Sequence, residues 1–406
     1  MRAACGCWRY RSSTCIHGPS YPPTLRCHVM RNTYRKLLSV LFFTVLGVLA
    51  SEIAALTVAP AGPMASARTT HTSTLLNDGS VLIVGGVNQD GVVKTAELFD
   101  PRSMTFGQTG KPIWPRYLHT ATLLTDGRVL LVGGIGRANI IVATAELYDP
   151  KTKSFSPAAK LKLPRHEHCA TTLRDGRVLI SGGYAVGQMA ERAEIYDPIT
   201  NSFTEVGNLI WPRAGHAALL LTDGNVLVAG GSGRNLHGNP QSFVDTPWTQ
   251  AEVFDTVRLA FFATGVLDKA RPHSAGVVLP DGRAALFGGG WLDSQHQSEF
   301  YDLATRKFTL SIEGPGYGPR LHTATLLPDG RVTLVGGVSI IYQEGQWALP
   351  SIAIFDSRTN QFSDAVIRLQ DARQSHTATL LQDGRVLVVG GVNRAGALRS
   401  AEVISP

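Results

Sequence analysis

The chain has 406 residues, and its formal net charge of +7 arises entirely within the first fifty. That segment carries seven Lys and Arg and no acidic residue, whereas residues 51–406 carry 31 charges of each sign. The neutral body argues against a nucleic-acid-binding protein. Four of the five cysteines precede Met30 and only Cys169 follows it, so the body cannot hold a disulfide framework.

The N-terminal segment is typical of a targeting sequence. A short basic stretch at 30–36 is followed by a charge-free apolar run of 14 residues at 37–50, which ends in small residues. This pattern predicts a signal peptide over 30–50 and therefore a periplasmic or secreted protein. The alternative is a protein that stays membrane-anchored by residues 37–50, although this run is short for crossing a bilayer. Residues 1–29 are interpreted as an upstream extension.

Seven copies of one hairpin follow. An Asp-Gly dipeptide begins at Asp78, Asp126, Asp175, Asp223, Asp281, Asp329 and Asp383, and a Gly-Gly pair follows each Asp seven residues later. Asp-Gly between apolar runs predicts a type I′ turn, with positive φ at both residues. The strand after the turn is apolar on both faces, which predicts that it is covered on both sides. The paired glycines are expected where a side chain would obstruct a neighbour.

Two further strands complete each repeat. The third is predicted at sequences such as AELFD (96–100) and AELYD (145–149), and the fourth contains an aromatic residue, at Phe106, Phe155, Phe203, Phe261, Phe308 and Phe362. Four short strands in each repeat of about fifty residues predict the blades of an all-β, seven-bladed β-propeller over residues 51–406. The seventh repeat lacks its fourth strand, and we expect the segment around Val58 to supply it and close the ring.

These motifs resemble kelch repeats, in a bacterial form similar to the propeller domain of galactose oxidase. The resemblance covers residues 53–406. It implies a seven-bladed propeller of four-stranded blades, a fold that hosts both binding modules and enzymes.

Several repeated polar residues are predicted to belong to the scaffold. A His precedes six of the Asp-Gly turns, at His71, His119, His168, His216, His322 and His376, with Ser274 in the fifth repeat. One His per blade is expected to serve the hydrogen bonding of its own blade rather than to bind metal. His166 and His168, two apart on one strand face, are the best local metal candidate, but no metal site is predicted. Cys169 is expected to be a buried, inert thiol.

An Arg and a Glu also recur together. The Arg stands three residues before the His, at Arg68, Arg116, Arg165, Arg213, Arg271 and Arg373, and the Glu lies on the third strand, at Glu97, Glu146, Glu194, Glu252, Glu299 and Glu402. In the sixth repeat both change, to Pro319 with Arg320 displaced by one, and to Ala353. We therefore predict a half-buried Arg–Glu ion pair in each of the other six blades.

The candidate binding residues lie in loops. Antiparallel strands place the Asp-Gly turns on one face of the ring, and place the loops after Gly-Gly and between blades on the other, which we call the loop-rich face. Two insertions fall there, at 232–250 and 338–351, together with every tryptophan beyond residue 50. Large aromatics in loops suit glycan or protein recognition. The predicted ligand-binding residues are Trp248, Trp291, Trp347, Tyr342, Arg234, His237, Trp114 and Trp211.

The sequence favours an exported binding or scaffold protein that recognises a glycan or a protein on the loop-rich face, without a cofactor. The alternative is a carbohydrate-active enzyme on the same face, galactose-oxidase-like or sugar-mutarotase-like. The galactose oxidase resemblance implies copper held by tyrosines and histidines, with one tyrosine cross-linked to a cysteine. Cys169 occupies an ordinary strand position, which argues against that chemistry. Acid–base groups for a mutarotase would come from Arg234, His237, Asp245, Asp293, His296 and Glu344.

Overall fold

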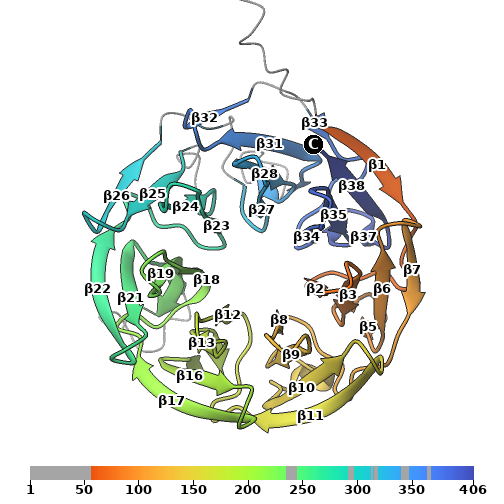
Figure 1. Ribbon diagram of the computed structural model, residues 1–406, viewed down its shortest axis with the longest axis horizontal. Helices are drawn as coiled ribbons and strands as arrows, with labels where there is room; N and C mark the ends of the chain where they lie inside the picture. Colours follow the sequence, from red (N-terminus) through yellow and green to blue (C-terminus); the bar gives the residue numbers. More distant parts are fainter. Residues whose placement is uncertain are drawn as a thin grey trace, which may run out of the picture. The chain divides into compact units, whose positions relative to one another are not determined.

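The computed structural model describes residues 56–234, 245–290, 297–311, 314, 319–339, 347–363 and 367–406. Residues 56–406 form one compact unit of seven antiparallel blades around a central axis (Figure 1). No helix within the described ranges is long and apolar enough to cross a membrane. The signal peptide and the upstream extension fall outside these ranges and stay predictions.

Each blade runs from an inner strand at the axis to an outer strand at the rim (Figure 1). Blade 1 contains β2 (Thr72–Leu75), β3 (Val81–Val84), β6 (Ala96–Asp100) and β7 (Thr105–Gln108). Blade 2 contains β8 (Thr120–Leu123), β9 (Val129–Val132), β10 (Thr144–Asp149) and β11 (Ser154–Lys160). Blade 3 contains β12 (Cys169–Thr172), β13 (Val178–Ser181), β16 (Arg192–Asp197) and β17 (Ser202–Asn208). Blade 4 contains β18 (Ala214–Leu220), β19 (Val226–Arg234), β21 (Gln250–Asp255) and β22 (Ala260–Val266), with β20 (Asp245–Pro247) paired to β19.

The remaining blades follow the same order. Blade 5 contains β23 (Ala275–Val278), β24 (Ala284–Phe287), β25 (Glu299–Asp302) and β26 (Lys307–Leu310). Blade 6 contains β27 (Thr323–Leu326), β28 (Arg331–Val335), β31 (Ser351–Asp356) and two short outer strands, β32 (Gln361–Phe362) and β33 (Ile367–Arg368). Blade 7 contains β34 (Thr377–Leu380), β35 (Val386–Val389), β38 (Ala401–Ser405) and β1 (Thr57–Ala61). The predicted closure is confirmed, because β1 pairs with β38 and Val58 lies opposite Ile404.

Short elements extend the loops that follow Gly-Gly. They are the hairpins β4 (Val87–Asn88) with β5 (Gly91–Val92), β14 (Tyr184–Ala185) with β15 (Gln188–Met189), β29 (Val338–Ser339) with β30 (Trp347–Ala348), and β36 (Val392–Asn393) with β37 (Gly396–Ala397), and the 3-10 turn η1 (Arg137–Asn139).

The core lies between neighbouring blades. The second strand of each blade is buried along its length, as in Val129–Val132 of β9. One face of β9 packs on blade 3, since Leu130 and Val132 belong to the same cluster as Val178 and Ile180. The other face packs on blade 1, since Val129 and Leu131 cluster with Leu82 and Val84. The prediction of strands covered on both sides is confirmed.

The Asp-Gly turns differ from the predicted type I′ turn. In blade 1 the Gly79 amide donates to the Leu76 carbonyl at 3.0 Å, and the Leu76 amide donates to the Ser80 carbonyl at 2.8 Å. Gly79 has a φ of 86°, whereas Asp78 does not have a positive φ. This is a three-residue loop, a type I turn followed by a left-handed glycine. Asp78 is placed to accept a hydrogen bond from the Ser80 amide at 2.9 Å, which a two-residue loop would not allow.

The Gly-Gly pairs lie where blades meet. A Cβ atom on Gly133 of blade 2 would collide with the Arg165 carbonyl oxygen of blade 3 and would lie 2.8 Å from Cε1 of His168. A Cβ atom on Gly134 would lie 2.7 Å from Cβ of His119 in its own blade. Both glycines also have positive φ, at 60° and 91°. The predicted obstruction by a neighbour is therefore confirmed.

Candidate binding face

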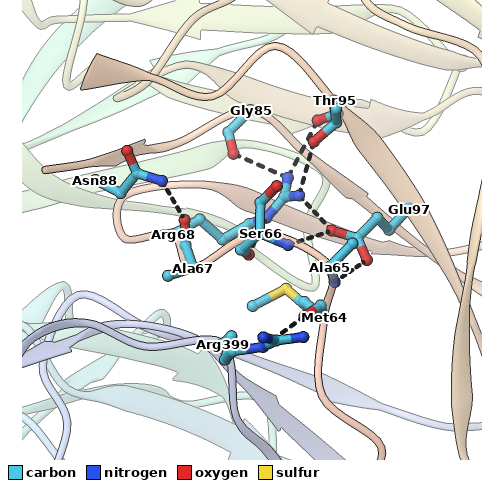
Figure 2. Close-up of polar contacts among 10 residues, drawn as sticks. All are labelled: Met64, Ala65, Ser66, Ala67, Arg68, Gly85, Asn88, Thr95, Glu97 and Arg399. Carbon is cyan, nitrogen blue, oxygen red and sulfur yellow. Dashed lines mark hydrogen bonds and ion pairs between the residues drawn. The ribbon is translucent and has the colours of Figure 1, made fainter. Parts of the chain in front are cut away.

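A buried ion pair supports the loop that enters each of six blades. In blade 1, Nη2 of Arg68 lies 2.6 Å from Oε1 of Glu97, and Nη1 of Arg68 donates to the Gly85 carbonyl at 3.1 Å (Figure 2). The Glu97 carboxylate also accepts the backbone amides of Ala65, at 2.8 Å, and Ser66, at 3.4 Å. One carboxylate therefore neutralises the guanidinium and fixes the turn of the linking loop.

The same arrangement recurs as the sequence predicted, but the pairs are fully buried rather than half-buried. The six pairs are Arg68–Glu97, Arg116–Glu146, Arg165–Glu194, Arg213–Glu252, Arg271–Glu299 and Arg373–Glu402. Burial lowers the pKa of Arg213 to about 10, although Glu252 opposes this shift. Burial likewise raises the pKa of Glu252, so both shifts have the same cause, the cost of holding charge away from water.

In each of these six linking loops, two consecutive residues reach the solvent and bond through their backbone amides to the buried Glu. We call these two residues the crown pair. The amides of a crown pair bond to the buried Glu, so its backbone has the same position in six blades. The crown pairs are Ala65–Ser66, Ile113–Trp114, Lys162–Leu163, Ile210–Trp211, Asp268–Lys269 and Gln370–Asp371, for blades 1, 2, 3, 4, 5 and 7. The hairpin after Gly-Gly lies on the same face, because the Asn88 side-chain amide donates to the Ala67 carbonyl at 3.0 Å (Figure 2).

Five of the six repeated histidines bond to a neighbouring blade, so the prediction that they serve their own blade is wrong for His71, His119, His168, His216 and His376. Nε2 of His119 lies 3.0 Å from Oγ1 of Thr72 in blade 1, and Nε2 of His168 lies 2.9 Å from Oγ1 of Thr120 in blade 2. His71 reaches Thr377 of blade 7 in the same way, at 3.0 Å. The inner strands of neighbouring blades lie side by side around the axis. A His side chain on such a strand therefore reaches a hydroxyl group of the neighbouring blade.

A closed ring of backbone hydrogen bonds surrounds the axis on the loop-rich face. Each member lies directly before the repeated His or Ser274, and its amide donates to the carbonyl of the preceding member at 2.9–3.4 Å. The axial ring consists of Thr70, Leu118, Glu167, Gly215, His273, Leu321 and Ser375. All seven have positive φ, between 50° and 60°, a conformation that costs about 1 kcal/mol or more in a residue with a side chain. The surrounding blades must therefore impose it.

The axial ring carries two ionisable side chains, Glu167 and His273, separated by Gly215. The His273 imidazole lies over Gly215, since a Cβ atom there would lie 2.7 Å from Cε1 and from Nδ1 of the ring. Sequence reasoning did not single out either residue as a site. The available signal was an ionisable residue directly before the repeated His or Ser274, where other repeats have Thr, Leu, Gly or Ser.

The ring also explains why the pair His166 and His168 does not converge. Glu167 between them has a φ of 52°, which breaks the alternation expected of a strand. His166 stacks on Tyr184 at 5.4 Å, whereas His168 bonds to Thr120. No group of three or more His, Cys, Asp or Glu that could hold a metal ion occurs within the described ranges.

The predicted ligand-binding residues are only partly within the described ranges. Trp114 and Trp211 belong to crown pairs. Trp248 is partly buried, and its indole Nε1 donates to the Pro212 carbonyl at 3.2 Å, so it also holds the blade 4 insertion against the linking loop. Arg234 ends β19 and Trp347 begins β30.

The other candidates fall outside the ranges that the structure describes. They are Trp291, Tyr342 and His237 among the ligand-binding residues, and Asp293, His296 and Glu344 among the acid–base candidates. Asp245, the first residue of β20, pairs with Arg234 in the strand register.

Cys169 is the free cysteine of the described chain. Its Sγ donates to the His216 carbonyl at 3.1 Å. Burial raises the pKa of the thiol to about 12, which agrees with an inert structural role.

The seven blades and their kelch-like motifs define a kelch-type β-propeller. The family described as Kelch motif matches residues 116–162. A search of curated proteins finds no match. Among solved structures, the chain is similar to one described as a novel fungal alcohol oxidase with catalytic diversity among the AA5 family, in complex with copper. The two are 18% identical, with a TM-score of 0.68 over 87% of this chain and 76% of that chain. At this identity the likeness concerns the fold alone. The kelch-type propeller predicted from the sequence is thus confirmed.

Proposed function

We propose that this protein is an exported binding module that takes its ligand on the loop-rich face, around the axial ring and the insertions of blades 4 and 6. The ligand we favour is a glycan, because tryptophans beside polar groups suit the faces and hydroxyls of sugars, and Trp248 of the blade 4 insertion is partly exposed. A protein ligand is the other outcome of the same test. Export rests on the targeting pattern at 30–50.

One observation carries this proposal: the two faces differ in how strictly they repeat. On the Asp-Gly face, turn after turn pairs the Asp with an Arg two residues later, as in Asp126–Arg128 at 2.6 Å and Asp175–Arg177 at 2.7 Å. On the loop-rich face a nearly constant backbone carries different side chains in every blade. Side chains that vary on a fixed framework are where recognition is usually built.

An acid–base enzyme remains a second candidate because of Glu167 and His273. Both residues belong to the axial ring, and one ring member, Gly215, lies between them. A carboxylate and an imidazole held in this way suit proton transfer to and from a carbohydrate. Turnover of a glycan that is lost in Glu167→Gln and in His273→Gln, with binding retained, would establish this candidate.

The binding proposal is tested by a glycan screen followed by titration of any hit. We expect the Trp248→Ala/Trp347→Ala variant to lose most of its affinity. The control is Ile199→Ala/Val257→Ala, whose side chains are exposed on the Asp-Gly face. Equal binding by both variants and the unaltered protein would refute the proposal, and binding only to proteins would replace the glycan as ligand.

A further inference from the structure

The crown pairs divide the loop-rich face into two halves. Blades 2, 3 and 4 present Ile113–Trp114, Lys162–Leu163 and Ile210–Trp211, whereas blades 5 and 7 present Asp268–Lys269 and Gln370–Asp371. In each of the six blades the backbone of the crown pair is held in the same way by the buried Glu of that blade. The blades therefore differ here only in the side chains of their crown pairs. Blades 2–4 are consecutive in the ring (Figure 1), so their apolar crown pairs lie along one arc.

The loops after Gly-Gly show the same division. Ile140, beside η1 of blade 2, is 66% exposed, and Val186, at the tip of the β14–β15 hairpin of blade 3, is 77% exposed. The corresponding tips of blades 1 and 7 expose polar or small residues, Gln89–Asp90 and Arg394–Ala395. Large apolar side chains are thus exposed in the loops of blades 2–4, at Ile113, Trp114, Ile140, Val186 and Ile210, and Val266 at the end of β22 is exposed as well.

Cations accompany these apolar residues. Lys111, Arg137, Lys160 and Lys162 are exposed on the arc. The exposed acids described there are Glu191 and Glu205, and Glu205 forms an ion pair with Arg192 at 3.2 Å. The neutral charge balance of the body therefore hides a local excess of positive charge beside exposed Ile, Val and Trp side chains.

We propose that the arc of blades 2–4 docks on an anionic lipid surface, with Ile140 and Val186 inserting among the headgroups. Its apolar side chains stand on separate loops of the three blades, and the same loops carry Lys111, Arg137 and Lys162. Trp and Lys side chains favour the membrane–water interface. Apolar insertion and attraction to anionic headgroups then add to each other. Trp114 and Trp211, two of the predicted ligand-binding residues, also lie on this arc. The variants that test lipid docking leave them, the axial ring, Trp248 and Trp347 unaltered, so lipid docking and ligand binding can fail separately.

The test is sedimentation with protein-free vesicles of phosphatidylcholine alone or mixed with phosphatidylglycerol. The protein is produced through the secretory route, so that its N-terminus is processed as in the cell. We expect tighter binding to the anionic vesicles and weaker binding at high salt. The Ile140→Ser/Val186→Ser variant should bind these vesicles at least about tenfold more weakly, since each apolar side chain contributes through its own burial.

The Asp-Gly face supplies a matched control for each class of side chain. Ile199→Ser/Val257→Ser replaces the same two residue types where they are 93% and 90% exposed, and it should leave vesicle binding unchanged. Lys111→Glu/Lys162→Glu should weaken binding by about tenfold or more, whereas Lys151→Glu/Lys307→Glu should not.

Three outcomes would overturn the proposal. They are equal binding to neutral and anionic vesicles, equal losses in the arc and control variants, and sedimentation with native membranes but not with protein-free vesicles. The last would assign the arc to a membrane protein partner instead of lipid. Circular dichroism and thermal unfolding of every variant establish that the fold is intact.

Discussion

Removing the carboxylate of one buried ion pair should destabilise the whole propeller. Glu194 lies 2.9 Å from Nη2 of Arg165 and accepts the amides of Lys162, at 2.8 Å, and Leu163, at 3.1 Å. In Glu194→Ala the guanidinium stays buried without its counter-charge, and two amides lose their acceptor. We expect a loss of about 3–5 kcal/mol in the free energy of unfolding, since breaking a buried pair strands the remaining charge. This is a large share of the roughly 5–15 kcal/mol that holds a typical protein folded.

A double-mutant cycle separates pairing from simple loss of packing. Arg165→Ala alone should cost a similar amount, but the double variant should cost much less than the sum, with a coupling of about 2–4 kcal/mol. The matched control is the exposed pair Arg192–Glu205 of the same blade, at 3.2 Å, for which the coupling should stay below about 1 kcal/mol. Urea unfolding followed by tryptophan fluorescence measures all of these values. Additive losses at Arg165 and Glu194 would refute the reasoning.

Three further results are expected. Burial lowers the pKa of His216 to about 3, so below about pH 6.5 the unfolded chain binds more protons than the folded one. The free energy of unfolding should therefore fall by about 1.4 kcal/mol per pH unit from this residue as the pH drops toward 3. Urea midpoints measured at several pH values should fall less steeply in His216→Gln, and identical slopes would contradict this. Gly182→Ala should lower the free energy of unfolding in urea by at least about 2 kcal/mol more than Gly187→Ala does. Both glycines have positive φ, but only at Gly182 would the new Cβ atom collide with a neighbouring blade. Equal losses would argue against close contact between the blades at Gly182. The pKa of the Cys169 thiol is raised to about 12, so the thiol should resist alkylation at pH 8 until urea unfolds the chain. Mass spectrometry of the peptide that contains Cys169 measures the labelling. Rapid labelling of the native protein would contradict the inert role of this thiol.

The repeat made most of the fold predictable, because one pattern written seven times averages out local ambiguity. Blade number, strand order and closure by the segment around Val58 all followed from the spacing of Asp-Gly, Gly-Gly and the aromatic residues. The Arg–Glu pairs were predictable because the sixth repeat loses both partners together. Their depth of burial was not, because periodicity tells which residues share a face but not what covers it.

The errors have a common physical origin. Asp-Gly is compatible with both a two-residue and a three-residue loop, and only the pairing of Leu76 with Ser80 distinguishes them. A His that occurs once per blade can bond within its own blade or to the preceding one, and the two possibilities have the same sequence period. The axial ring has no sequence signal of its own, since its bonds are made by the backbone of seven residues of dissimilar type.

Contacts between blades also explain how the loop-rich face can vary so freely. Five blades bond a His to the preceding blade. Every blade has a glycine that makes room for the next blade, and every blade contributes one link of the axial ring. Because the ring is closed, no blade can leave without breaking contacts on both of its sides, so the blades are expected to unfold together rather than singly. The crown pairs make none of these contacts with their side chains. Asp371 is an exception, because its carboxylate accepts a hydrogen bond from Ser400 Oγ at 2.5 Å. Substitutions at the other crown positions are therefore expected to cost the fold little, and the segregation of apolar and cationic residues to blades 2–4 is not required by the architecture.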